Sequence, residues 1–419
     1  MRLNGGKTAG LLALSTVLLC PSTLRAYSVM THQAMVDSAW IEGIQPLLKR
    51  RFPSASSENL RQARAYSYGG SIIQDLGYYP FGSKFFTNLV HYVRTADFIK
   101  ALIDNSRDIN EYAFALGALA HYASDNSGHP LGVNPSVPLL YPKLGAKYGK
   151  SVTYAASPSA HLKTEFGFDV LQVARGNYTP DSYRDFIGFK VSKEVLQRAF
   201  EEVYCIPLKD LFLSLDLSIG TYRRTVSKIL PEATKVAWEL KRKDIEKFYP
   251  GITSDKFIYR LARRDYEREW GAEYEKPGPA SKVLSVLMRI VPRVGFFKAL
   301  SFKMPNAETE KLFVESFQAS AKNYLQYLKQ LQGGEFQLED RDFDTGRLVK
   351  AGEYRLCDET YAELLDKLTA KNRIISAALR SNITGFYGNL DAPIAGKENR
   401  KAWRKVLENL ESLKSASAQ

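Results

Sequence analysis

The sequence predicts an all-α protein, and three observations support that prediction. Apolar residues recur at helical spacing through most of the 419-residue chain, as in residues 31–52. We find no stretch with the sustained alternation of a half-buried strand. Hydrophobic residues make up 45% of the chain, which is enough to bury a large core. The length favours either two domains or one domain with a long extension.

The first 26 residues have the pattern of a secretory signal peptide. Arg2 and Lys7 provide a basic start, residues 10–20 form an apolar run, and Ala26 ends a plausible cleavage site. The run is too short for a comfortable membrane span, and no second run of about 20 apolar residues follows. We therefore predict a secreted or periplasmic mature chain that begins at Tyr27 and has no transmembrane segment.

Several helices are expected in the first 250 residues, each with an apolar stripe. Glycine, proline and tyrosine are frequent in two intervening segments, 66–83 and 128–150, which we predict to be loops. The expected helices span residues 31–52, 108–128, 157–174, 190–202 and 219–246.

A domain boundary is predicted at Lys276-Pro277-Gly278-Pro279. It divides a catalytic region, residues 27–276, from a C-terminal region, residues 280–419, whose role the sequence does not reveal. Three helices are expected in this second region, near 307–332, 358–380 and 396–414. Residues 283–303 are apolar with regularly spaced Arg and Lys, which is typical of a helix pair broken at Pro292 or of a segment on a membrane surface.

The charge and the cysteines leave alternatives open. The net charge is +13, and removing the three basic residues of the first 26 leaves 55 basic against 45 acidic residues, or +10. A basic surface favours anionic lipid headgroups or nucleic acid, and it also serves solubility alone. Cys205 and Cys357 either form one long-range disulfide or remain buried thiols.

The five histidines are confined to the first 161 residues. His121 and Asp125 are four residues apart on an apolar helix, so they share one face, and His161 and Glu165 repeat this spacing. Imidazole and carboxylate at this spacing can converge on one cation, as zinc requires. A single such pair is usually a hydrogen bond on a helix surface. Two pairs, in a chain whose histidines all lie in the same region of the sequence, indicate a metal centre instead.

Taken together, these residues resemble a known superfamily that contains the bacterial zinc-dependent phospholipases C and the single-strand-specific zinc nucleases. The amino-terminal domain of glycosylphosphatidylinositol-specific phospholipase D is similar. The ordered match covers roughly residues 27–170. The resemblance implies an α-helical bundle with two to three zinc ions in a cleft, followed here by a C-terminal helical extension.

The resemblance also implies the zinc ligands. In the family, the mature amino-terminal Trp binds zinc through its amine and carbonyl; Tyr27 takes that position here. The spacing between Asp125 and His129 is shorter than in the soluble bacterial phospholipases and closer to the phospholipase D-like branch. Asp125 is expected to bridge two ions, and Asp75 is expected to take the proton of the attacking water as well. The implied ligands are Tyr27, His32, Asp75, His91, His121, Asp125, His129, His161 and Glu165.

The function implied by the resemblance is a secreted phosphodiesterase that hydrolyses phospholipids, as phospholipases C do, by attack of zinc-activated water. A phospholipid or membrane surface is then the expected partner. Two alternatives stay open: a zinc-dependent single-strand nuclease, and a non-catalytic, metal-stabilised binding protein. The aromatic residues Tyr78-Tyr79-Pro80-Phe81, Tyr66, Tyr68 and Tyr154 could hold a choline headgroup, stack on a nucleobase, or form core.

Overall fold

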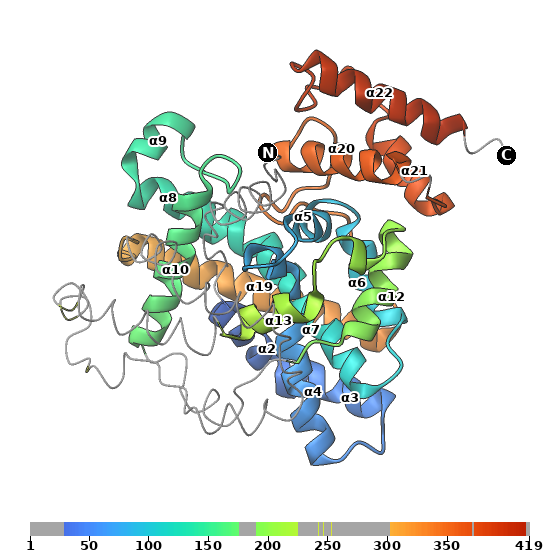
Figure 1. The fold of residues 1–419 in the computed structure, drawn as a ribbon. Helices are drawn as coiled ribbons and strands as arrows, with labels where there is room; N and C mark the ends of the chain where they lie inside the picture. The colour runs from blue at the N-terminus through green and yellow to red at the C-terminus, as the bar shows by residue number, and fades with distance from the viewer. Residues whose placement is uncertain are drawn as a thin grey trace, which may run out of the picture.

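The computed structural model describes residues 29–175, 190–224, 302–370 and 373–415, with the single residues 242, 246 and 253. This part of the chain is helical, contains no β-strand and has one isolated bridge between Arg341 and Leu348 (Figure 1). The all-α prediction is confirmed. The helices up to and including the one that carries His121 and Asp125 are α2 (Val29–Ala39), η1 (Trp40–Ile44), α3 (Gln45–Arg51), α4 (Ser57–Gly70), η2 (Ile73–Tyr78), α5 (Lys84–Tyr92), α6 (Thr95–Asp104) and α7 (Ile109–Gly128).

The remaining helices include the C-terminal ones. They are η3 (His129–Val133), α8 (Asn134–Leu140), α9 (Pro142–Tyr148), α10 (Pro158–Arg175), α12 (Lys193–Tyr204), η4 (Leu208–Asp210), α13 (Leu215–Arg224), α19 (Ala307–Gly333), α20 (Arg355–Ala370), α21 (Ala377–Phe386) and α22 (Arg400–Ser415).

Helix α7 is the central element. Its first turn is capped by Asp108, whose carboxylate accepts hydrogen bonds from the backbone N–H groups of Asn110 and Glu111. Every residue from Glu111 to Asp125 is buried. A helix buried on all sides needs neighbours on all sides, and α2, α4, α6 and α19 pack around it. The later part of α7 therefore lies in the interior of the molecule.

Two glycines allow α4 and α7 to approach closely. A Cβ atom at Gly70 would lie 1.9 Å from the carbonyl oxygen of Phe114, and one at Gly117 would lie 2.0 Å from that of Ser67. No side chain fits at such distances, so the crossing requires glycine on both helices. The approach brings Ser71, just after α4, against α7.

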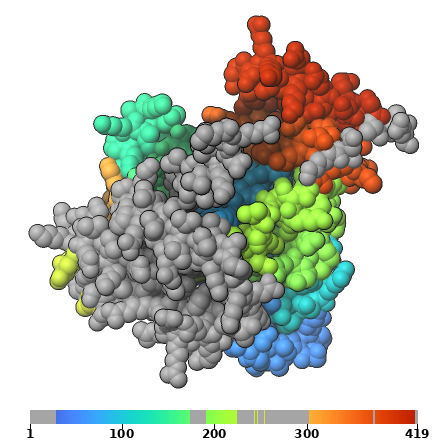
Figure 2. Space-filling view, viewed as in Figure 1, coloured from blue at the N-terminus to red at the C-terminus, as the bar shows by residue number. Residues whose placement is uncertain are grey.

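Helix α19 joins the C-terminal region to this core. Asn306 and Thr309 form a capping box at its start. The helix packs along α7, and the buried Tyr324 donates a hydrogen bond to the carbonyl oxygen of Leu116 at 2.8 Å. One hydrophobic core cluster includes residues before 224 and residues after 323. Helices α20, α21 and α22 lie together at one end of the molecule (Figures 1 and 2).

Some sequence predictions of secondary structure were wrong. The range 358–380 contains two helices, α20 and α21, because the Ser376 side chain caps a new helix by accepting from the N–H of Leu379. The predicted loop at 66–83 includes the end of α4 and the 3-10 helix η2. The predicted loop at 128–150 is largely η3, α8 and α9. Most of its prolines lie in first turns, where a helix needs no N–H donor.

Several predictions fall outside the described residues. These are the signal peptide, Tyr27, most of the predicted helix 219–246 after Arg224, the boundary at 276–279 and nearly all of residues 283–303. Among the described residues, no helix has the length and apolar character needed to cross a membrane. Cys205 and Cys357 are separate thiols, so the disulfide alternative does not hold.

Candidate metal centre

Eight of the nine predicted ligands lie in the described part of the chain, and all eight are buried in one region. Six different elements supply them. They are His32 on α2, Asp75 on η2, His91 on α5, His121 and Asp125 on α7, His129 at the start of η3, and His161 and Glu165 on α10. The ninth, Tyr27, lies outside the described residues.

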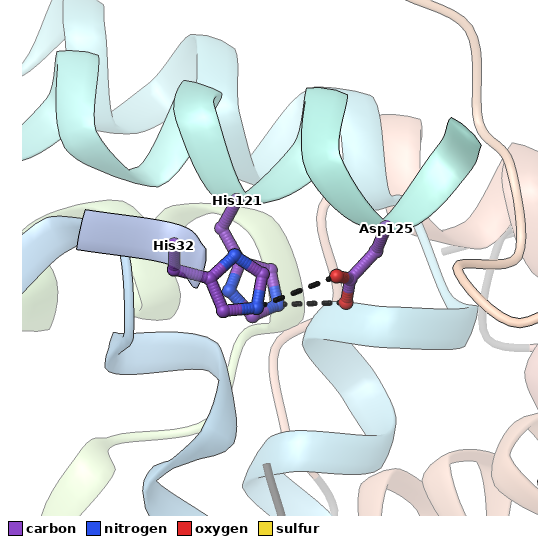
Figure 3. A group of neighbouring side chains, drawn as sticks. All are labelled: His32, His121 and Asp125. Atoms are coloured by element: carbon purple, nitrogen blue, oxygen red, sulfur yellow. Dashed lines mark ion pairs between the residues drawn. The ribbon is translucent and has the colours of Figure 1, made fainter. Parts of the chain in front are cut away.

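Asp125 lies at the centre of the site. Its Oδ1 atom is 3.5 Å from His32 Nε2, and its Oδ2 atom is 3.0 Å from His121 Nε2. The two imidazole rings stack with centroids 4.2 Å apart and planes 17° apart, so both rings present Nε2 to the same carboxylate (Figure 3). One potential ligand atom from each of these three residues lies within 4.8 Å of the others. This group is the first of three possible metal sites.

The second group contains Asp75, His91 and His121. Asp75 Oδ1 is 3.4 Å from His91 Nε2, and Asp125 Oδ2 is 3.7 Å from the same nitrogen. Thr87 on α5 holds η2 in place, because its hydroxyl donates to the carbonyl oxygen of Gln74 and accepts from the N–H of Gly77. The second group therefore shares His121 with the first and is adjacent to Asp125.

The third group contains His129, His161 and Glu165. Glu165 Oε1 is 2.8 Å from His161 Nε2 and 3.2 Å from His129 Nε2. His161 and Glu165 lie one turn apart on α10, as their spacing predicts. His129 begins a π-helical turn directly after α7, and π-turns inside helices are frequent at functional sites. Its Nε2 atom is 3.8 Å from Asp125 Oδ1, which places the third group beside the first.

Backbone carbonyl groups orient three of the histidines. Nδ1 of His91 lies 2.8 Å from the carbonyl oxygen of Thr87, and Nδ1 of His121 lies 2.9 Å from that of Ser71. Nδ1 of His129 lies 2.9 Å from the carbonyl oxygen of Phe343. Because a carbonyl only accepts, Nδ1 donates in each case, and Nε2 keeps its lone pair for a metal ion. These partners could not be identified from the sequence.

Sequence reasoning missed the contribution of the segment 338–347. Phe343 N–H donates to the carbonyl oxygen of His91 at 3.2 Å, and the Phe343 ring lies 5.0 Å from the His91 ring and 5.8 Å from the His121 ring. Asp344 Oδ1 lies 3.5 Å from His129 Nδ1. The sequence shows only a polar stretch here, with no spacing that relates it to histidines about 200 residues earlier.

Burial and charge shift several pKa values in the centre. Burial, together with the charge of His121, lowers the pKa of His32 well below its ordinary value, which favours the neutral ring. Burial also raises the pKa of Asp75. At Asp125 burial acts in the same direction, but the charges of His121 and His129 outweigh it and hold the pKa well below its usual range.

The residues of this site fit zinc. Three carboxylates are buried here, and within the described residues their ion-pair partners are histidines. His121 Nε2, Asp125 Oδ1 and Glu165 Oε2 are buried and make no well-directed hydrogen bond to the part of the chain described. Such atoms are costly without a partner, and imidazole nitrogens with carboxylate oxygens are the ligands that zinc prefers.

Two of the predicted aromatic residues lie beside the centre. The half-buried Tyr78 ring packs edge-on against His91 at 6.0 Å, and Tyr154 packs against His161 at 5.7 Å. Tyr78 and Tyr154 also contact each other at 6.0 Å. Tyr79 and Tyr68 are buried instead, against Tyr222 and beside Asp37 respectively, so they are core residues.

Comparison with known proteins identifies one family. Residues 31–213 match the family described as zinc dependent phospholipase C. The match includes all eight described ligand candidates and ends before α19. No curated protein and no solved structure matches the chain significantly. The family match confirms the resemblance stated from the residues alone.

Proposed function

We propose, from the premise that residues 31–213 belong to the zinc-dependent phospholipase C superfamily, that this protein is a secreted zinc phosphodiesterase acting on phospholipids. One observation carries the proposal. Histidines and carboxylates from six elements converge into three adjacent groups, each able to hold one metal ion. A chain that needed these residues only for packing would not bury three carboxylates among five histidines.

The described residues would hold up to three ions. One ion fits His32, His121 and Asp125, with Tyr27 as a further proposed ligand; a second fits Asp75, His91 and His121; and a third fits His129, His161 and Glu165. Asp125 lies within 4 Å of four of the histidines, so we propose it as the bridging carboxylate. Bound zinc supplies a Lewis acid that neutralises phosphate oxygens and makes hydroxide available near neutral pH.

Asp75 is the proposed proton acceptor. Its carboxylate is buried beside His91 and His32, and η2 is held to α5 through Thr87. A carboxylate fixed in this way can take the proton of the attacking water while the phosphodiester bond breaks. Tyr78 and Tyr154 then offer aromatic surface beside the reacting group, which suits a choline headgroup.

A single-strand nuclease is the second candidate, because the same tyrosines suit a nucleobase. The positive charge of the chain, +13 over its full length, attracts either polyanion. The lipid is preferred here because the family described for residues 31–213 is a phospholipase family.

The test uses the full chain from Tyr27 onward. Zinc is counted by elemental analysis, and the protein is assayed with phosphatidylcholine vesicles and with single-stranded DNA. We expect two to three zinc ions per chain and release of phosphocholine. His121→Ala and Glu165→Gln should each lose zinc and at least about 100-fold in activity, as loss of a metal site removes its transition-state stabilisation.

The matched control is Asp340→Asn. Asp340 is a half-buried carboxylate that accepts from the N–H of Ala96, and asparagine can accept the same hydrogen bond. This variant should keep full zinc and full activity. DNA cleavage without lipid hydrolysis would move the protein to the nuclease alternative, and a wild-type chain that binds no zinc would refute the proposal.

A further inference from the structure

The segment 338–347 is attached to the metal centre at several points. Phe343 binds through its backbone on both sides: its N–H donates to the carbonyl oxygen of His91, and its carbonyl oxygen accepts from His129 Nδ1. Its ring covers His91 and His121. Gly346 lies so close to α7 that a Cβ atom there would be 2.4 Å from the carbonyl oxygen of Asn126. The segment therefore forms part of the wall of the centre, although it lies beyond the family match.

Within this segment, the Asp344 carboxylate is buried and firmly held. Its Oδ2 atom accepts hydrogen bonds from the hydroxyl groups of Tyr92, at 3.0 Å, and Tyr354. Its backbone carbonyl oxygen accepts from Asn134 Nδ2 at 2.6 Å. These donors come from the end of α5, the start of α8 and the turn before α20. Two parts of the chain thus hold the carboxylate, and a third holds the backbone of the same residue.

The other oxygen of this carboxylate faces a histidine of the third group. Asp344 Oδ1 is 3.5 Å from His129 Nδ1, and it lies on the side of the ring away from Nε2, Asp125 and Glu165. A carboxylate on the Nδ1 side of a histidine fixes the ring orientation and makes Nε2 a stronger donor to a metal. The Asp344 side chain is only 4% exposed, and the whole residue 3%, so water does not weaken this interaction.

We propose that Asp344 is a positioning residue for His129, so that the C-terminal region completes the third metal site. This inference rests on the proposed zinc centre. It assigns a role to a segment that neither the family match nor the sequence explains. Tyr92 and Tyr354 hold the Asp344 carboxylate. This carboxylate and the Phe343 carbonyl oxygen orient the His129 imidazole. The oriented imidazole would then bind an ion together with His161 and Glu165.

The test measures zinc alone on the full mature chain, without substrate. Zinc affinities are determined by competition with a chromophoric chelator, and the cobalt-substituted protein is examined by visible spectroscopy, which reports ligand geometry. We expect Asp344→Ala to weaken one ion by roughly 10- to 100-fold, leave the others unchanged and alter the cobalt spectrum. Asp344→Asn should show the same change to a smaller extent, because asparagine keeps the shape and loses the charge.

The matched control is Asp342→Asn. Asp342 is a buried carboxylate of the same segment, but its oxygens accept from the N–H and hydroxyl of Thr345. The Asp342→Asn protein should bind every zinc ion with wild-type affinity. A folded Asp344→Ala protein with wild-type affinities and spectrum would overturn the inference.

A second variant decides the matter if Asp344→Ala does not fold. Tyr354→Phe removes one hydroxyl donor to the carboxylate and keeps the ring. We expect it to weaken the same ion, and wild-type affinity for every ion would contradict the inference. Failure of the proposed function looks different. A wild-type chain without zinc overturns both proposals, whereas a chain that binds zinc without hydrolysing lipid leaves the role of Asp344 standing.

Discussion

At the scale of single residues, the candidate centre depends on carboxylates whose ion-pair partners, in the part of the chain described, are buried histidines. The Asp125 carboxylate lies within 4 Å of four of these histidines, so a change in its position would affect more than one group. The pKa shifts show the same dependence, because the histidine charges hold Asp125 ionised against the effect of burial.

Asp342 makes the stability of the protein depend on pH. Burial raises its pKa to about 6 in the folded state, from an ordinary value of 3.8, so folding favours the protonated form. This contribution to stability is complete below pH 4 and is lost as the pH rises through 6. Asp342→Asn keeps partners for both bonds to Thr345 and carries no charge. Between pH 4 and pH 6.5, the free energy of unfolding of the variant should rise by up to about 3 kcal/mol relative to that of the wild type.

Urea unfolding of both proteins at several pH values checks this prediction. The difference between the two free energies of unfolding should be near zero at pH 4 and should reach its plateau above pH 6. A difference that does not change with pH would show that Asp342 ionises normally in the folded protein.

Spacing and residue type predicted the candidate ligands that the fold brings together, but not the groups that support them. His121 with Asp125 and His161 with Glu165 lie within single helices, so four-residue spacing is enough to place each pair on one face. Ser71, Thr87 and Phe343 act through backbone carbonyl groups, which every residue possesses, so their identity gives no signal. Asp344 has a distinctive side chain, but only the folded chain brings it to His129.

At the scale of elements, the crossing of α4 and α7 sets the position of His121. Gly117→Ala would place a methyl group 2.0 Å from the Ser67 carbonyl oxygen and force the helices apart. We expect a loss of at least about 2 kcal/mol in stability from overpacking. Zinc affinity should fall as well, because the Ser71 carbonyl would move away from His121.

The control for this substitution is Gly385→Ala. Gly385 lies within α21, where an added Cβ would meet nothing within 4 Å. Alanine should stabilise this helix by about 0.5 to 1 kcal/mol. Thermal unfolding and chelator competition on both variants test the pair. Equal behaviour of the two variants would show that the glycine contact does not control the site.

Prediction of the elements succeeded where the apolar pattern was long. Residues 108–128 and 307–332 correspond closely to α7 and α19, whose buried faces are continuous. The segment 128–150 was interpreted as a loop from its prolines, but a proline in a first turn is compatible with a helix. Composition alone does not distinguish these two uses of proline.

At the scale of the whole molecule, the predicted catalytic region shares its core with the C-terminal helices. Tyr324 and Leu328 of α19 are buried in the cluster that contains α7. We therefore expect a chain of residues 27–276 to lack a cooperative thermal transition, because it exposes the face of α7 that α19 covers. Circular dichroism melting and a zinc count test this against the full chain. A cooperative melt with full zinc content would instead support two separate domains.

The hydrogen bond between Phe343 and His129 also has a consequence in time. A polypeptide is synthesised from its amino end, so His161 and Glu165 are present well before residue 343. The Phe343 carbonyl oxygen, which binds His129 Nδ1, therefore becomes available only after most of the chain has been synthesised. A centre built in this order is complete only after most of the chain has been synthesised, so a chain that stops before residue 343 would lack this support for His129.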